Sequence, residues 1–104
     1  MRRILAAGAL GALALAACTQ RQPQTWTIPV DDLAFGPSPQ GLHVGDTVVW
    51  TNHDLFQHSA TAQGVFDVEL PAGGSGRTLL KQPGLIVYIC RYHPGMTARL
   101  EVKP

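Results

Sequence analysis

The stretch Leu85–Val102, LIVYICRYHPGMTARLEV, decides the fold. Its first six residues form a β-branched and aromatic run that follows the turn signal Pro83-Gly84. Its last six residues, TARLEV, alternate polar with apolar side chains, as a half-buried strand does. Proline and glycine in the segment between these two runs favour a tight turn. The stretch therefore predicts two strands joined by a short turn.

Similar strand signals recur upstream, and no long 3.6-residue period follows the first 17 residues. The strongest is TVVWT, which follows the turn signal Gly45-Asp46. The first strand contains Pro29, which is tolerated at a sheet edge. About seven short strands in a single small chain predict one all-β domain, a Greek-key β-sandwich. The predicted strands are Trp26–Val30, Leu42–Val44, Thr47–Thr51, Phe66–Leu70, Arg77–Lys81, Leu85–Cys90 and Thr97–Val102.

The N-terminus, MRRILAAGALGALALAAC, has the pattern of an export signal. Two arginines precede an apolar run over residues 4–17, which suits the hydrophobic region of a signal peptide and is short for a membrane span. The end of the run, LAAC, resembles the lipobox of bacterial lipoproteins. This resemblance implies cleavage before Cys18 and a lipid on that cysteine, whereas an ordinary secretory signal cut nearby is the alternative.

These features divide the chain into three parts. We expect a signal peptide over residues 1–17, a polar tether over residues 18–25 and one folded domain over residues 26–104. Without the two signal arginines, 8 − 2 = 6 Lys+Arg remain against 7 Asp+Glu. No basic stripe is present, so the charge pattern of a nucleic-acid-binding protein is missing. With Cys18 lipidated, Cys90 has no disulfide partner, and a bound metal would protect its thiol from oxidation.

Three candidate metal ligands lie close together in the turn: Cys90, His93 and Met96. Thiolate and thioether sulfur combined with imidazole select copper among the common metals. Two histidines and a cysteine with a long axial methionine make an electron-transfer copper site. Such a site requires a second histidine from elsewhere in the chain.

The second histidine is one of His43, His53 and His58. His43 lies in a short predicted strand, and His53 lies in a polar segment between Asn52 and Asp54. A solvated surface histidine is the simpler interpretation of both. His58 follows the TVVWT strand and a short polar-apolar segment that can return toward the sheet.

Four motifs in this order resemble the cupredoxins, the small type 1 (blue) copper proteins. They are VVWTN, His58-Ser59, P-G-x-x-x-Y-x-C and C-x-x-H-x-x-M, and they cover residues 41–102. The short ligand loop is most similar to that of the amicyanin and plastocyanin-like members. The resemblance implies one copper ion that cycles between Cu(I) and Cu(II). It implies His58, Cys90 and His93 as strong ligands and Met96 as the weak axial ligand.

The resemblance also implies roles for residues around the ligands. Asn52 is expected to hydrogen-bond across to the cysteine-side loop and so to hold the two ligand regions together. His93 is expected to be the electron port, surrounded by an apolar docking collar of Pro94, Leu55 and Phe56, with core packing as the alternative for the last two. Arg91-Tyr92 departs from the Thr-Pro or Ser-Pro pair common between cysteine and histidine.

The function implied is a monomeric electron carrier of the bacterial periplasm or cell envelope, anchored to the membrane through lipid on Cys18. Its partners would be redox proteins such as a cytochrome, a dehydrogenase or a reductase. An envelope protein for copper storage, delivery or protection is the alternative. We do not expect an enzyme, because four histidines are too few for a copper oxidase and no carboxylate, Asp54 and Asp67 included, is expected beside a zinc-bound water.

Overall fold

The computed structural model describes residues 20–104 together with Gly8 and Gly11. The predicted cleavage site and the lipidation of Cys18 lie outside the described residues, and the division of the chain stays a prediction. Within the described residues, no helix is long and apolar enough to cross a membrane.

Nine strands make up the described fold, which confirms the prediction of an all-β sandwich. Two of these strands were not predicted. One is only two residues long, and the other, HSATA, has no run of large apolar residues. The strands are β1 (Thr25–Asp31), β2 (Ala34–Phe35), β3 (Leu42–His43), β4 (Thr47–Asn52), β5 (His58–Ala62), β6 (Phe66–Leu70), β7 (Ser75–Leu79), β8 (Gly84–Cys90) and β9 (His93–Lys103).

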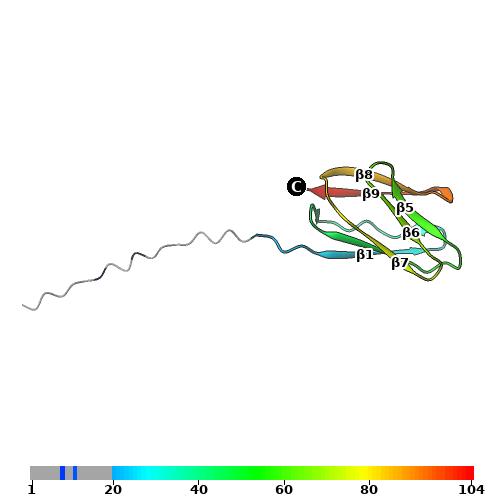
Figure 1. Ribbon diagram of the computed structural model, residues 1–104, viewed down its shortest axis with the longest axis horizontal. Helices are drawn as coiled ribbons and strands as arrows, with labels where there is room; N and C mark the ends of the chain where they lie inside the picture. The colour runs from blue at the N-terminus through cyan, green and yellow to red at the C-terminus, as the bar shows by residue number, and fades with distance from the viewer. Residues whose placement is uncertain (1–7, 9–10, 12–19) are drawn as a thin grey trace, which may run out of the picture.

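The strands form two sheets that face one another (Figure 1). One sheet has the order β2-β1-β4-β7, and the other has the order β3-β9-β8-β5-β6. β1 runs parallel to β4 and β3 runs parallel to β9, whereas the other pairs are antiparallel. β2 pairs with only the last two residues of β1, so Pro29 lies beyond that ladder and its missing N–H costs no strand pairing there.

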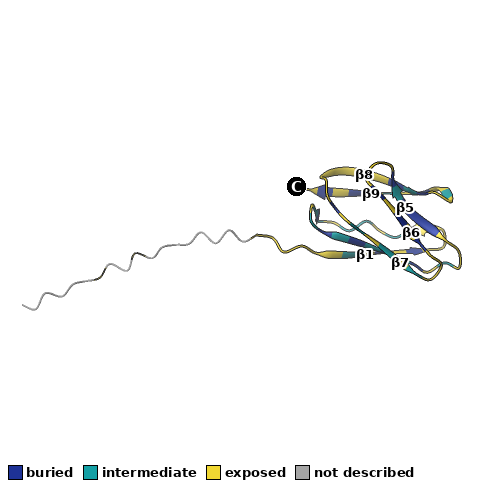
Figure 2. Cartoon of the chain, viewed as in Figure 1, coloured by how far each residue is buried: buried dark blue, intermediate teal, exposed yellow. Residues whose placement is uncertain are grey.

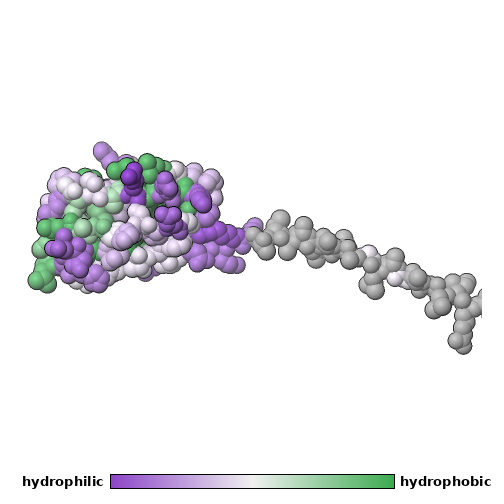
Figure 3. All heavy atoms as spheres, turned by 180° about the vertical axis from the view of Figure 1, so that it is seen from behind, coloured by the Kyte–Doolittle hydropathy of each residue, from purple (hydrophilic) through white to green (hydrophobic). Residues whose placement is uncertain are grey.

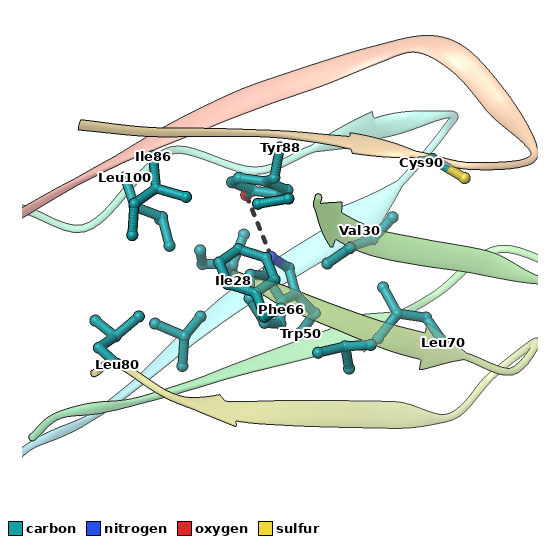
Figure 4. Packing of buried hydrophobic residues seen from close by; sticks show 14 of the residues in the cluster. Ile28, Val30, Trp50, Phe66, Leu70, Leu80, Ile86, Tyr88, Cys90 and Leu100 are labelled. Atoms are coloured by element: carbon teal, nitrogen blue, oxygen red, sulfur yellow. Dashed lines mark hydrogen bonds between the residues drawn. The ribbon is translucent and has the colours of Figure 1, made fainter. Parts of the chain in front are cut away.

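The core lies between the sheets and is built around a group of aromatic rings. Trp50 and Tyr88 are fully buried, and Trp50 Nε1 donates a hydrogen bond to the Tyr88 hydroxyl at 3.2 Å (Figure 4). The same burial raises the pKa of Tyr88 to about 12. Alternate residues of β8 point inward, so Cys90 follows Tyr88 onto the core side. Figure 4 shows Cys90 at the end of the core away from Leu80.

The two ends of the sandwich carry different chemistry. At one end, which we call the ligand end, β8 turns into β9 (Figure 1). The other end, which we call the anchor end, holds the turn between β3 and β4 and the last residues of β9, and the chain enters the domain there (Figure 1). The side chain of Asp46, at the anchor end, is fully buried.

Asp46 is surrounded by donors. Its carboxylate accepts hydrogen bonds from the Arg21 guanidinium, from the backbone N–H groups of Gln24 and His43, and from Trp26 Nε1. These bonds, the arginine first among them, hold the pKa of Asp46 far below the usual carboxyl range. The last residues of the predicted tether are therefore bonded to the domain.

Candidate metal centre

Three side chains meet at the ligand end. His58 opens β5, Cys90 closes β8 and His93 opens β9. Cys90 Sγ lies 3.6 Å from His58 Nδ1 and 3.7 Å from His93 Nδ1, and the three potential ligand atoms all lie within 4.8 Å of one another. His58 and Cys90 are fully buried, whereas His93 is half-buried. The structure thus brings together three of the four predicted ligands.

Local pairing explains how the hairpin presents two of them. Cys90 pairs with His93 across the β8–β9 ladder, where the register shifts between Ile89 and Cys90. The turn is made by Arg91 and Tyr92, and β9 already begins at His93. The prediction of a turn through Pro94-Gly95 is therefore wrong in position: these residues lie in the first part of β9.

The spacing of the three atoms suits a metal ion. Metal–ligand bonds of about 2.0–2.1 Å to nitrogen and about 2.3 Å to sulfur put those atoms about 3.6–3.8 Å apart when the angle at the metal is about 110–120°. The two sulfur–nitrogen distances, 3.6 Å and 3.7 Å, lie in this range. Two imidazole nitrogens and a thiolate form a soft donor set that suits copper, whose electron-transfer sites use these three ligands.

The predicted axial ligand, Met96, is placed on the same side of the sheet as the core. It is buried and belongs to the apolar cluster that contains Cys90. In β9 the buried residues are Met96, Leu100 and Val102, and Ala98 between them packs against the core, whereas Pro94 and Gly95 are exposed. Its role as a ligand stays a prediction.

Sequence reasoning missed the contact that Asp54 makes with His58. Asp54 Oδ2 lies 2.7 Å from His58 Nε2, the ring nitrogen that faces away from Cys90. The same carboxylate accepts the backbone N–H groups of Asp32 at 2.8 Å and Leu33 at 3.0 Å. These donors, the histidine first, lower the pKa of Asp54. The spacing Asp54-x-x-x-His58 in a loop was the available signal.

The Asp54 contact orients the histidine ring. Metal-binding histidines usually donate their second ring N–H to a carboxylate or a carbonyl, which sets the tautomer and the ring orientation. With Nε2–H bonded to Asp54, the lone pair of His58 Nδ1 points toward Cys90 Sγ. Asp54 thus prepares His58 to bind a metal through Nδ1.

The role expected of Asn52 belongs to a different residue. Its amide Nδ2 donates to the carbonyls of Phe56, Leu70 and Pro71, and its Oδ1 accepts from Asp54 N. These bonds hold the β4–β5 loop against the end of β6, not against the cysteine-side loop.

Ser59 makes the connection to the cysteine side. Its Oγ accepts the backbone N–H of Arg91 at 2.8 Å, and its backbone N–H lies 3.4 Å from Cys90 Sγ. Ser59 follows His58 directly in β5, and its hydroxyl and backbone N–H contact the segment that contains Cys90 and Arg91. The position after the histidine was the signal that pointed to it.

Phe56, one residue of the predicted docking collar, lies beside the half-buried histidine. The ring of Phe56 lies 5.1 Å from that of His58 and 5.7 Å from that of His93, and 44% of the residue is exposed. Leu55 is 93% exposed, which excludes core packing for it, and Pro94 is exposed as well. Figure 3 shows hydrophobic surface at this end of the domain. Its use for docking stays a prediction.

Arg91 and Tyr92, which replace the Thr-Pro or Ser-Pro pair common at this place, form a polar network with balanced charges beside the collar. Arg91 bonds to Asp67 at 3.0 Å and to Glu69, and the Tyr92 hydroxyl donates to Glu69 at 2.9 Å. The arginine charge is therefore balanced by two carboxylates. The network fastens the β8–β9 turn to β6 without adding net positive charge to the collar.

The remaining two histidines do not converge with His58, Cys90 and His93. His43 is at the anchor end, where its Nδ1 lies 2.8 Å from the Gly41 carbonyl. His53 is exposed, and its backbone N–H donates to the Val30 carbonyl. Neither belongs to the group of potential metal ligands among the described residues.

Comparison with known proteins identifies the architecture. No family model matches the chain. Among solved structures, amicyanin from Paracoccus versutus is 18% identical over 76% of this chain and 81% of its own, with a TM-score of 0.63. The chain has the amicyanin fold. A reduced Cu(I) form of an amicyanin variant is 24% identical over 76% of this chain and 82% of its own, with a TM-score of 0.61. The resemblance to the cupredoxins is thereby confirmed at the level of fold.

Proposed function

We propose that this protein is a type 1 copper protein that carries single electrons between redox partners in the bacterial cell envelope. The observation that carries the proposal is the convergence of His58 Nδ1, Cys90 Sγ and His93 Nδ1 within 4.8 Å at one end of an amicyanin-like sandwich. Met96 completes the set as the weak axial ligand. Copper, when bound there, supplies a one-electron couple between Cu(I) and Cu(II).

The residues of this chain hold the donor set in place. Asp54 orients His58 through Nε2, and Ser59 ties the strand of His58 to the turn that follows Cys90. His58 and Cys90 are fully buried, so neighbouring side chains leave little room for either to move. A donor set that stays in one position lowers the rearrangement that accompanies each electron transfer.

Electrons enter and leave through His93. It is the only one of the three converging side chains that is not fully buried, and it lies beside Phe56 and the exposed Pro94. A small apolar surface with a charge-compensated rim suits the brief docking of redox partners, whose interfaces are small. The partner class therefore includes cytochromes, dehydrogenases and reductases.

Two observations favour electron transfer over copper storage or delivery. Met96 is the only methionine besides Met1, so the chain offers no spare thioether ligands through which copper could be passed. Two of the three converging ligands are fully buried, which opposes ready exchange. We further propose that the signal pattern and the lipobox place the protein at the membrane through lipid on Cys18 and that it acts as a monomer, without enzymatic activity.

Titration of the fragment that begins at Thr19 with Cu(II) tests the proposal. We expect an intense thiolate-to-copper absorption band at one equivalent, bleached by reductant and restored by oxidant, with a matching EPR spectrum. Cys90→Ser should abolish the band, whereas His43→Ala, which removes a histidine at the anchor end, should leave it unchanged. A colourless complex would exclude a type 1 site, and copper storage, delivery or protection would then be the better hypothesis.

A further inference from the structure

The N-terminal segment is fastened to the anchor end by an ion pair. Arg21 Nη1 donates to Asp46 Oδ1 at 2.7 Å, and Nη2 donates to Oδ2 at 2.9 Å. The Asp46 side chain is fully buried, whereas 36% of the Arg21 side chain is exposed. Bidentate arginine–carboxylate pairs are strong and geometrically specific. The pair therefore holds Arg21 in one place on the domain surface.

Backbone bonds hold the following residues to the same place. Gln24 N donates to Asp46 Oδ1 at 2.8 Å, and Thr47 N donates to the Gln24 carbonyl at 2.9 Å. The chain between Arg21 and the start of β1 is thus bonded to the turn that precedes β4. Among the described residues, Arg21 is the first that these bonds hold to the domain.

The remaining tether is short compared with the domain. Cys18 precedes Arg21 by three residues, and three fully extended residues reach at most about 11 Å. β9 runs from the ligand end to the anchor end with eleven residues. At about 3.3 Å per residue it is about 36 Å long. A lipid on Cys18 therefore lies near the anchor end and far from His93.

We infer that the Arg21–Asp46 ion pair orients the domain on the membrane, with the anchor end against the lipid surface and the ligand end facing the solvent. The inference rests on the lipidation of Cys18 in the proposed function. It narrows the partner to a water-soluble redox protein, or an extramembrane redox domain, that docks on a surface about 36 Å from the anchor end. Direct exchange with a redox group inside the bilayer is excluded.

Energy transfer between labels on the protein and an acceptor dye on lipid headgroups measures the orientation. The mature chain, purified from bacterial membranes, is placed in phosphatidylcholine vesicles. A keto-bearing noncanonical amino acid, which leaves Cys90 untouched, carries the donor dye at one of two exposed positions. Lys103 reports the anchor end, since it pairs with His43, and Leu55 reports the ligand end. We expect several-fold stronger transfer from Lys103 than from Leu55.

Two variants and one control test whether the Arg21–Asp46 ion pair causes the difference in energy transfer between the two label positions. Arg21→Gln removes the bonds that hold the chain before Gln24 to the domain. It should reduce the difference in energy transfer between the Lys103 and Leu55 labels. Asp46 keeps three other donors in this variant, so the domain should still fold. A flexible Gly/Ser insertion of about ten residues between Thr19 and Gln20 should reduce the difference with the ion pair intact. Arg77→Gln removes the same charge from exposed β7 and should change nothing.

The outcomes distinguish the inference from the function on which it rests. Mass spectrometry of the N-terminal peptide reports lipidation, and the copper spectrum reports the metal site. A chain without lipid on Cys18 overturns both the anchoring and the orientation. A lipidated chain with equal transfer from the two labels overturns the orientation alone. An Arg21→Gln variant that retains the full difference overturns the role of the ion pair.

Discussion

Replacing Asp54 by asparagine tests how the protein prepares His58 to bind a metal. The variant keeps the shape of the side chain but only one of its two oxygens, of which Oδ1 accepts the backbone N–H of Asp32 and Oδ2 that of Leu33. It also removes the negative charge 2.7 Å from His58 Nε2. A hydrogen bond to a charged acceptor contributes about 1.5–3 kcal/mol, against about 0.5–1.5 kcal/mol for a neutral one. We therefore expect a loss of about 1.4 kcal/mol, or about tenfold in copper affinity, within the range found for such outer-sphere changes.

The same change should raise the reduction potential. The carboxylate charge favours the more positive Cu(II) ion, so its removal favours Cu(I). If the tenfold loss falls mainly on Cu(II), the potential rises by about 60 mV. Competition titrations with a chelator measure the affinity, and a redox titration of the absorption band measures the potential.

Asp67→Asn is the matched control for this prediction. It removes a carboxylate of the same size near the ligand end, but one that is 58% exposed and bonded to Thr61 and Arg91, not to a candidate ligand. Arg91 keeps its bond to Glu69 in this variant, so the β8–β9 turn stays fastened to β6, and we expect the copper affinity and the potential to stay close to those of the wild type. Equal values for Asp54→Asn, Asp67→Asn and wild type would refute the role of Asp54.

Three further changes test the framework of the site and the fold. Ser59→Ala leaves Arg91 N without its acceptor and should cost about 1–2 kcal/mol of unfolding free energy, with faster amide exchange at Arg91; unchanged exchange would contradict the tie. Asp46→Asn should cost about 3 kcal/mol at neutral pH. Because folding lowers the pKa of Asp46, the stability that this carboxylate contributes is complete above the ordinary carboxyl pKa of about 4 and declines as the pH falls below it. The difference in unfolding free energy between variant and wild type, measured by urea unfolding, should therefore narrow in acid. A difference that does not change with pH would contradict this role of Asp46. Trp50→Phe removes core volume and the bond to the Tyr88 hydroxyl and should cost about 2–3 kcal/mol in the same assay, whereas a loss below about 1 kcal/mol would mean that the core relaxes around the gap.

The sequence predicted those strands whose side chains have a clear period or a β-branched run. β5 was missed because His58–Ala62 is built from small and polar residues, although it is buried along most of its length (Figure 2). Its partners β6 and β8 on either side place it inside the sheet, and small residues fit there without creating a local apolar pattern. A strand that is buried because of its place in the sheet order need not have an apolar pattern in its own sequence.

The residues of the candidate site also differ in how far the sequence could predict them. Cys90 and His93 were predictable because their spacing is local, and the ladder that joins β8 to β9 brings them together. The Asp54 contact was not predicted, because it depends on how the loop before β5 folds back. Asn52 was expected to make the hydrogen bond to the cysteine-side loop that Ser59 makes instead. The direction in which each of these side chains points depends on strand pairing, which the sequence alone does not show.

The turn between β1 and β2 has a consequence for protein engineering. Asp32 and Leu33 have positive φ angles of 53° and 59°, an uncommon conformation for residues with side chains that costs about 1–3 kcal/mol each. Asp54 accepts both of their N–H groups, so the carboxylate that orients His58 is itself held by this turn. Libraries designed to tune the candidate metal site should therefore include residues 32 and 33, which lie far in sequence from every candidate metal ligand.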